Sequence, residues 1–290
     1  MPSVASVTFD GVSFLLAFGA LVHIGWSILE SGLLESIQLL AANPLLGGDP
    51  RLSDNLPIWT YMVGHILPGL VLQLLGTLFA TFVSREWRFA PRHDFKAAIL
   101  TVVALAGSGI LLAPLHKMMY EQKIGQLYFD IDKYSYSWVL ISIILALLIT
   151  ETWFFWIHLA LHQKTLYKYI HGVHHSFNPS TSACASAFHP LDIFILAMGA
   201  MLVPVLVPIH NGVYSGTLLV NLLSTVLQHT ATRTSFSMGV FNDPNLHNIH
   251  HDYGRKPKNL GSILCIWDRV VGTYEPNVPK WVKRKQEKSQ

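Results

Sequence analysis

The chain has 290 residues, of which 51% are hydrophobic and 13% are charged. Because an ordinary soluble domain carries about 25% charged residues, this composition excludes a soluble globular protein and indicates a chain embedded in lipid. The net charge of +3 is too small to indicate nucleic-acid binding, and two cysteines are too few for a disulfide framework.

The first half of the chain contains a series of apolar runs. Residues 12–28 form either a first membrane span or a helix lying at the interface, since acidic residues follow closely. Residues 58–83 contain no Asp, Glu, Lys or Arg, and about 20 apolar residues suffice to cross a bilayer. The loop after this span is basic and therefore expected on the cytoplasmic side; its cations are Arg85, Arg88, Arg92 and Lys96. Residues 97–115 then cross back, and residues 136–157 return the chain to the cytoplasmic side.

A long apolar segment follows at residues 191–227. Prolines and Gly212 divide it into two halves of about 18 residues, each reaching roughly 27 Å as a helix, which predicts a hairpin that returns the chain to the side it left. We therefore expect an all-α integral membrane protein with about four to six transmembrane or re-entrant helices. The expected organisation is N-terminal spans and loops over residues 1–135, a catalytic region over residues 136–276 and a basic tail over residues 277–290.

Histidine is the unusual residue of this chain, with 15 copies. Eight of them form three boxes, HxxxH, HxxHH and HxxHH: His158, His162, His171, His174, His175, His247, His250 and His251. Residues at i, i+3 and i+4 of a helix share one face, and the expected topology puts all three boxes on the cytoplasmic side. Neutral imidazole binds zinc, copper, iron or nickel, and one ion accepts at most about six ligands. The boxes therefore predict a site with two metal ions.

Four further residues are candidates around that site. His229 lies where the hairpin re-emerges and is a candidate ligand, and His189, in AFHPLD, is either a ligand or a supporting residue. Glu151 precedes His158 by seven residues, two helical turns on the same face. It and Asp252, which directly follows the third box, are candidates to hydrogen-bond a liganding imidazole from behind.

Beyond the spacing, the motifs resemble those of a known family. HLALH, HGVHH and HNIHH occur in that order, together with ETWFFWIH, LYKYIHGVHHSFNP, AFHPLD and WDRVVGTY. Over roughly residues 150–275 the chain resembles the fatty acid hydroxylase and sterol desaturase superfamily of membrane di-iron oxygenases. The subfamilies most similar in motifs are the C-5 sterol desaturases and the C-4 methylsterol oxidases.

The resemblance implies an O2-dependent oxidoreductase, a monooxygenase or desaturase of lipid metabolism. It implies that two non-haem iron ions activate O2 and that the enzyme then oxidises an unactivated C–H position of a lipid. The motifs resemble those of sterol-acting enzymes, which implies a sterol or a sterol-like lipid as the substrate. It implies the eight box histidines as ligands with His229 as the ninth, and His189 matches a histidine of the sterol-acting branches. The implied partners are the membrane, the lipid and an electron donor, cytochrome b5 or an NAD(P)H-dependent reductase. The implied location is the endoplasmic reticulum membrane, with the site facing the cytoplasm.

Alternatives remain open from the residues alone. A fatty-acyl or sphingoid-base hydroxylase of the same superfamily shares several of these motifs. A zinc-binding membrane transporter would also use histidines, although its ligands would follow a path through the spans. A catalytically silent relative that binds sterol is the third alternative.

Overall fold

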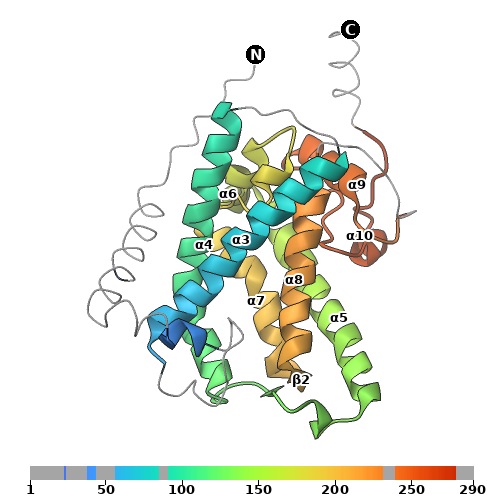
Figure 1. Cartoon of the computed structure of the whole chain (residues 1–290). Helices are drawn as coiled ribbons and strands as arrows, with labels where there is room; N and C mark the ends of the chain where they lie inside the picture. Colours follow the sequence, from blue (N-terminus) through green and yellow to red (C-terminus); the bar gives the residue numbers. More distant parts are fainter. Residues whose placement is uncertain (1–22, 24–37, 44–55, 85–90, 231–238, 279–290) are drawn as a thin grey trace, which may run out of the picture.

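A computed structural model describes residues 23, 38–43, 56–84, 91–230 and 239–278 of the chain. Apart from residue 23, the apolar run predicted at residues 12–28 lies outside the described residues, as do part of the basic loop and most of the basic tail. The described part is almost entirely helical (Figure 1). This confirms the predicted all-α fold.

Three long helices form the frame of the molecule: α3 Ile58–Ser84, α4 Pro91–Tyr120 and α5 Tyr136–Leu161. Each is long and apolar enough to cross a membrane, in agreement with the runs predicted from hydropathy. The structure corrects one boundary, because α4 continues past His116, which was expected to open a loop. The His116 ring is buried in α4 and lies 5.8 Å from the ring of His65 on α3, so tertiary packing extends the helix by about one turn.

The predicted hairpin is present as α7 Pro190–Leu206 and α8 Asn211–Gln228. His189 and His210 cap the two helices, each accepting a backbone N–H two residues later. Between the helices, β2 Ile209–His210 pairs in parallel with β1 Leu127–Tyr128. This short ladder fixes the hairpin turn to the loop between α4 and α5.

The helices pack closely because small residues lie at their contacts. The main contacts join α3 with α4, α5 with α7 and α4 with α7. A Cβ atom at Gly199 of α7 would lie 2.8 Å from the Trp153 side chain of α5, so only glycine admits the indole there. The Trp153 Nε1 donates to the Ile195 carbonyl at 2.8 Å, which fixes the register of α5 against α7.

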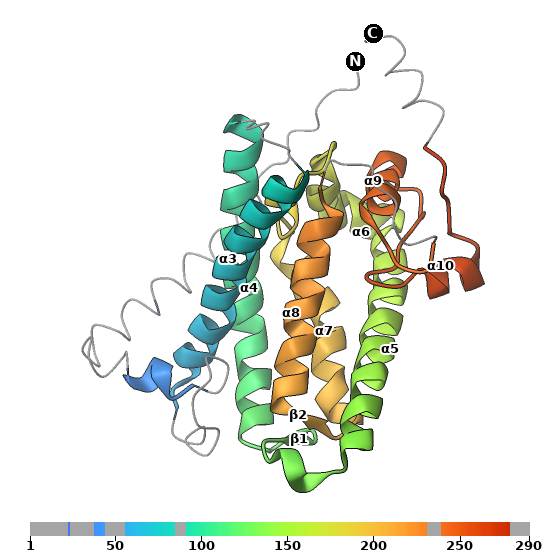
Figure 2. The same ribbon diagram turned by 45° about the vertical axis from the view of Figure 1, so that its right-hand side comes forward.

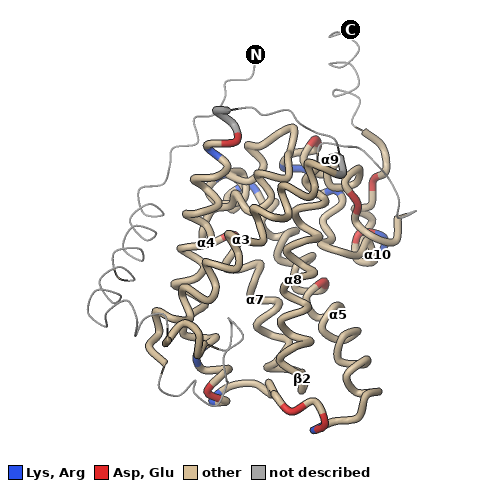
Figure 3. Tube along the Cα trace, in the orientation of Figure 1, with Lys and Arg blue, Asp and Glu red and all other residues tan. Residues whose placement is uncertain are grey.

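Short helices gather toward one end of this bundle, in the upper half of Figure 1: α6 Lys164–Tyr169, η4 His171–Ser176, η5 Ser182–Cys184, α9 Pro244–Tyr253 and α10 Ile266–Val271. The opposite end holds β1, β2 and η3 Ile131–Lys133. Charged residues collect mainly at these two ends, and the middle of the bundle is nearly free of them (Figure 3). This distribution is expected of helices that cross a bilayer.

The structure corrects the helix type predicted for the second histidine box. The i, i+3, i+4 spacing was expected on an α-helix, but residues 171–176 form the 3-10 helix η4. A Cβ atom at Gly172 would lie 2.6 Å from the Tyr167 carbonyl oxygen. The chain therefore turns back tightly on α6 at this glycine, and an α-helix does not continue through the box.

Candidate metal centre

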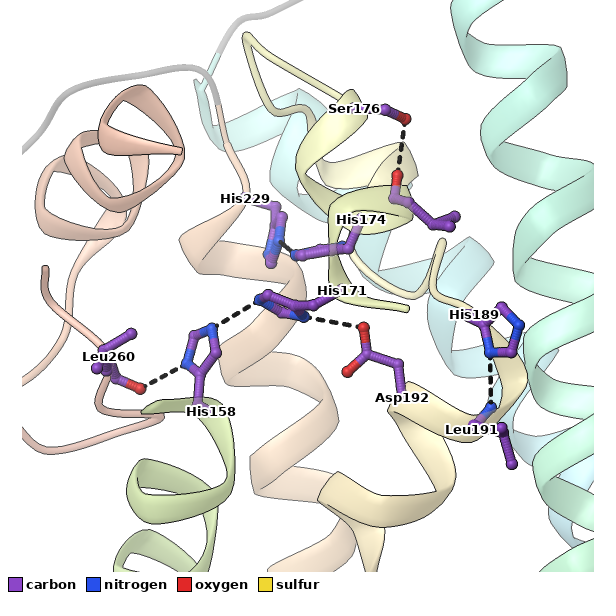
Figure 4. A network of polar contacts seen from close by, with 10 residues as sticks. His158, His171, His174, Ser176, His189, Leu191, Asp192, His229 and Leu260 are labelled. Carbon is purple, nitrogen blue, oxygen red and sulfur yellow. Dashed lines mark hydrogen bonds and ion pairs between the residues drawn. The ribbon is translucent and has the colours of Figure 1, made fainter. Parts of the chain in front are cut away.

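Nine buried histidines form two groups at the end of the bundle where the short helices gather. Figure 4 shows four of them, His158, His171, His174 and His229. In each group the ligand nitrogens lie within 4.8 Å of one another. The first group has five members: His158, His162, His171, His175 and His250. The second has four: His174, His229, His247 and His251. The side chains come from the ends of α5 and α8, from η4 and from α9.

The Nδ1 atoms of five of these rings face protein acceptors. The distances are 2.8 Å from His158 to the Leu260 carbonyl, 3.2 Å from His162 to that of Arg255, 2.9 Å from His171 to Asp192 Oδ2, 2.7 Å from His229 to the Thr225 carbonyl and 2.8 Å from His250 to that of Lys258. A carbonyl oxygen only accepts, so Nδ1 carries the proton in each carbonyl-bound ring. The Nε2 atom of each neutral ring then presents a lone pair to the group interior.

The distances between rings indicate that these lone pairs converge on a cation. His158 Nε2 and His171 Nε2 lie 3.0 Å apart. The Leu260 carbonyl puts the proton of His158 on Nδ1, and an ionised Asp192 carboxylate does the same for His171. No hydrogen therefore lies between the two atoms, and the lone pairs would repel each other. Two nitrogens that each lie about 2.1 Å from one ion, at right angles, are about 3.0 Å apart. The geometry thus suits a shared metal ion.

Unpaired buried atoms support the same conclusion. Within the described residues, His162 Nε2, His250 Nε2 and both ring nitrogens of His175 and His251 have no hydrogen-bond partner. A buried polar atom without a partner costs about 1–3 kcal/mol. Several such atoms in one place would be strongly unfavourable, and coordination of a metal ion removes this cost. The residues present therefore fit a pair of metal ions.

Electrostatics favours the form of histidine that binds metal. Burial lowers the pKa of both His162 and His229 to about 4. For His175, His250 and His251, burial and then the neighbouring imidazoles hold the pKa well below the ordinary value of 6.5. These rings are neutral at pH 7, and neutral imidazole is the ligand form.

The other predicted residues lie elsewhere. His189 belongs to neither group, because its Nδ1 accepts the Leu191 N–H at 3.2 Å as the cap of α7. Asp252 is half-buried in α9 beside His251. Glu151 was a candidate to hydrogen-bond an imidazole, but its carboxylate instead accepts three backbone N–H groups of residues 262–264 at 2.8–3.1 Å. It thereby holds the loop whose Leu260 carbonyl orients His158.

Asp192 is a functional candidate that spacing arguments missed. Its side chain is fully buried at the start of α7, and its Oδ2 lies 2.9 Å from His171 Nδ1 (Figure 4). A carboxylate behind a liganding imidazole fixes the ring orientation and raises its basicity. A signal was available, because Asp192 is the single charged residue in the apolar segment 191–227. An ionisable group in such a segment is a functional candidate.

Comparison with known proteins agrees with this geometry. Residues 143–273 match the family model described as Fatty acid hydroxylase, and all nine grouped histidines lie in that range. The matched range is 131 residues long, somewhat less than half of the chain. No solved structure matches the chain.

The chain is also similar to curated sterol-modifying proteins. A lathosterol oxidase of Rattus norvegicus is 31% identical over 158 residues, 52% of this chain and 51% of the relative. A lathosterol oxidase of Mus musculus is 30% identical over 195 residues, 65% of this chain and 63% of the relative. A Delta(7)-sterol 5(6)-desaturase of Gibberella zeae is 28% identical over 221 residues, which are 74% of this chain and 62% of the relative. The chain is thus similar to lathosterol oxidases and a sterol 5(6)-desaturase, and it spans between half and two thirds of the length of these relatives.

A cavity of about 210 Å³ adjoins the candidate metal centre between α5, α7 and α8. Histidines of both groups line one end, and apolar side chains such as Phe154, Leu196 and Leu222 form much of the wall. The lining hydroxyls of Thr150 and Thr225 donate to backbone carbonyls of their own helices. The cavity therefore offers an apolar ligand a largely apolar wall, with the histidines at one end.

Proposed function

We propose that the chain is an O2-dependent di-iron oxidoreductase that hydroxylates or desaturates an unactivated C–H position of a sterol or sterol-like lipid. The observation that carries this proposal is the apolar cavity with two groups of histidines at its end. The names of the lathosterol oxidases and sterol 5(6)-desaturases support a sterol as the substrate. A wall of this chemistry also suits a fused-ring lipid better than a polar metabolite.

We assign one ion to His158, His162, His171, His175 and His250, and the other to His174, His229, His247 and His251. Bound iron would supply the O2 activation that an unactivated C–H bond requires. Burial keeps the imidazoles neutral, and Asp192 and the backbone carbonyls described above aim the rings inward. His189 is left out of this ligand set, because it caps α7.

The wall of the cavity would position the lipid. Side chains of α5, α7 and α8 surround the ligand, so its reacting carbon would be held at the histidine end and water would be excluded. Residues 136–276 would form the catalytic region. We further propose that the protein lies in the endoplasmic reticulum membrane with its metal centre facing the cytoplasm. Cytochrome b5 or an NAD(P)H-dependent reductase would supply the electrons there.

The test is expression in two eukaryotic hosts, one lacking its own sterol C-5 desaturation and one lacking C-4 demethylation. The proposal predicts that the native chain restores an oxidised sterol in one of them and that the His175→Ala variant does not. An unchanged sterol profile in both hosts, with oxidised fatty-acyl or sphingoid products instead, would assign the chain to the other branch of the superfamily. Active protein that carries zinc and consumes no O2 would contradict the oxygenase proposal itself.

A further inference from the structure

The region around α10 exposes an apolar surface that the metal centre does not use. Val240, Phe241, Ile266, Val270 and Val271 are each at least 40% exposed; these five residues are called the α10 patch here. The backbone makes them neighbours, because Phe241 bridges to Leu264 and the Cys265 N–H donates to the Val240 carbonyl. Single exposed apolar residues are common, but a contiguous set marks a contact surface.

The position of α10 along α5 gives the depth of this patch. Trp267 Nε1 donates to Thr152 Oγ1 at 3.1 Å, and the Trp267 ring lies 5.8 Å from that of Trp156. Thr152 and Trp156 precede the end of α5 at Leu161 by nine and five residues, about 14 and 8 Å along the axis. Figure 2 shows α10 beside α5, below its upper end.

The length of α5 shows how deep in the membrane this position lies. Its 26 residues extend about 39 Å, whereas the hydrocarbon core of a bilayer is about 30 Å thick. A centred α5 would therefore project only about 5 Å beyond the core at each end. The contact with Trp267 then lies at or below the boundary between the headgroups and the acyl chains.

The α10 patch also continues the lipid-facing surface of α5. Leu140, Ile144 and Leu148 are exposed at intervals of four residues, and Trp156 continues this stripe two turns later with 47% exposure. Trp156 and Trp267 join the stripe to α10. Tryptophan is enriched at this depth of membrane proteins.

The charged groups of α10 do not oppose contact with lipid. Asp268 is buried and accepts the N–H groups of Leu260 and Gly261 at 2.8 Å. Arg269 Nε donates to the Gly239 carbonyl, and the guanidinium lies 4.3 Å from the centre of the Tyr274 ring. The patch can therefore enter an apolar boundary without burying an unpaired charge.

We propose that the α10 patch is a membrane contact, which enters the phospholipid leaflet on the metal-centre side at the boundary of headgroups and acyl chains. It attaches the C-terminal segment to the bilayer in addition to the long apolar helices. This contact does not depend on the reaction proposed above. Asp268 of α10 accepts the N–H of Leu260, and the carbonyl of Leu260 orients His158. The α10 patch is therefore connected to the metal centre through the Asp268 side chain.

The test uses spin labels on single introduced cysteines in the full chain, reconstituted in phosphatidylcholine vesicles. The native Cys184 and Cys265 are buried, so an introduced cysteine is the accessible one, and unsubstituted protein measures the background. Val270→Cys and Phe241→Cys report on the patch. Leu140→Cys on α5 is the lipid reference, and Lys164→Cys on the exposed side of α6 is the aqueous reference.

The measured quantity is the frequency at which each spin label collides with O2, divided by the frequency at which it collides with a water-soluble nickel complex. The proposal predicts that this ratio is several-fold higher at positions 270 and 241 than at position 164 and approaches the ratio at position 140. Equal ratios at 270, 241 and 164 would overturn it. Dipolar broadening at 270 that disappears on dilution with unlabelled protein would identify a second copy of the chain as the occupant, and would also overturn it. Two patch positions are used so that a poorly folded single variant does not decide the outcome.

Discussion

At the scale of single residues, the orientation of five of the nine imidazoles depends on the acceptor behind the ring. His171 is the clearest case, because the Asp192 carboxylate holds its Nδ1 at 2.9 Å while its Nε2 faces His158. A carboxylate in this position raises the basicity of the ligand and fixes the ring. Asp192 is therefore expected to control metal affinity without touching the metal.

The Asp192→Asn variant tests this expectation. The amide keeps the shape of the side chain but removes the charge, so metal affinity should fall by about 10–100-fold. Competition with a graded series of chelators measures the change. Asp132→Asn, the same substitution at an exposed position of η3, should leave metal retention unchanged. Equal retention in both variants would show that Asp192 does not support the site.

His250 and His189 separate the two roles that sequence reasoning gave to histidine. His250→Ala should lose metal, because its Nε2 belongs to the first group. His189→Ala should keep its full metal content, and loss of the cap of α7 should cost about 1 kcal/mol of stability. Metal analysis with thermal unfolding measures both effects. Loss of an ion from the His189 variant would place this residue among the ligands.

Sequence spacing found the ligand candidates at this scale but not their partners. The i, i+3, i+4 pattern needs no knowledge of the fold. The Leu260 carbonyl behind His158 lies 102 residues away in the chain, and the Lys258 carbonyl behind His250 depends on the turn after α9. Backbone carbonyls carry no sequence signature, so only the tertiary structure identifies them.

At the scale of elements, each HxxHH box serves both histidine groups. His171 and His175 join the first group whereas His174 joins the second, and in α9 His250 is separated from His247 and His251. The sequence predicted the boxes, the apolar spans and the hairpin. It did not predict this division, because the division depends on how η4 and α9 face each other. The tight turn at Gly172 changes that orientation by replacing an α-helix with a 3-10 helix.

Glu151 connects two of these elements. Its carboxylate in α5 accepts the N–H groups of Ser262, Ile263 and Leu264. Glu151→Gln keeps the size of the side chain but leaves at least one buried N–H without a good acceptor, so stability should fall by about 1–3 kcal/mol. Glu275→Gln, whose carboxylate accepts from the exposed Asn277, is the matched control. Thermal unfolding in detergent compares the two, and equal unfolding temperatures would contradict the assigned role.

At the scale of the whole molecule, the metal centre joins segments that the membrane helices bring to one end. The ends of α5 and α8, η4 and α9 meet around nine buried imidazoles, which would repel one another or remain unpaired without an ion. Metal binding should therefore stabilise the native arrangement of all four segments. Removal of the metal by a chelator should lower the unfolding temperature, and re-addition of ferrous iron should restore it.

The most direct test of the central claim is the metal content of the purified full chain. Element analysis of protein expressed with adequate iron should give about two irons per chain, because two groups of neutral imidazoles are present. The His250→Ala variant should contain fewer. A single ion per chain, or zinc in protein that is active, would contradict a di-iron centre built from these two groups.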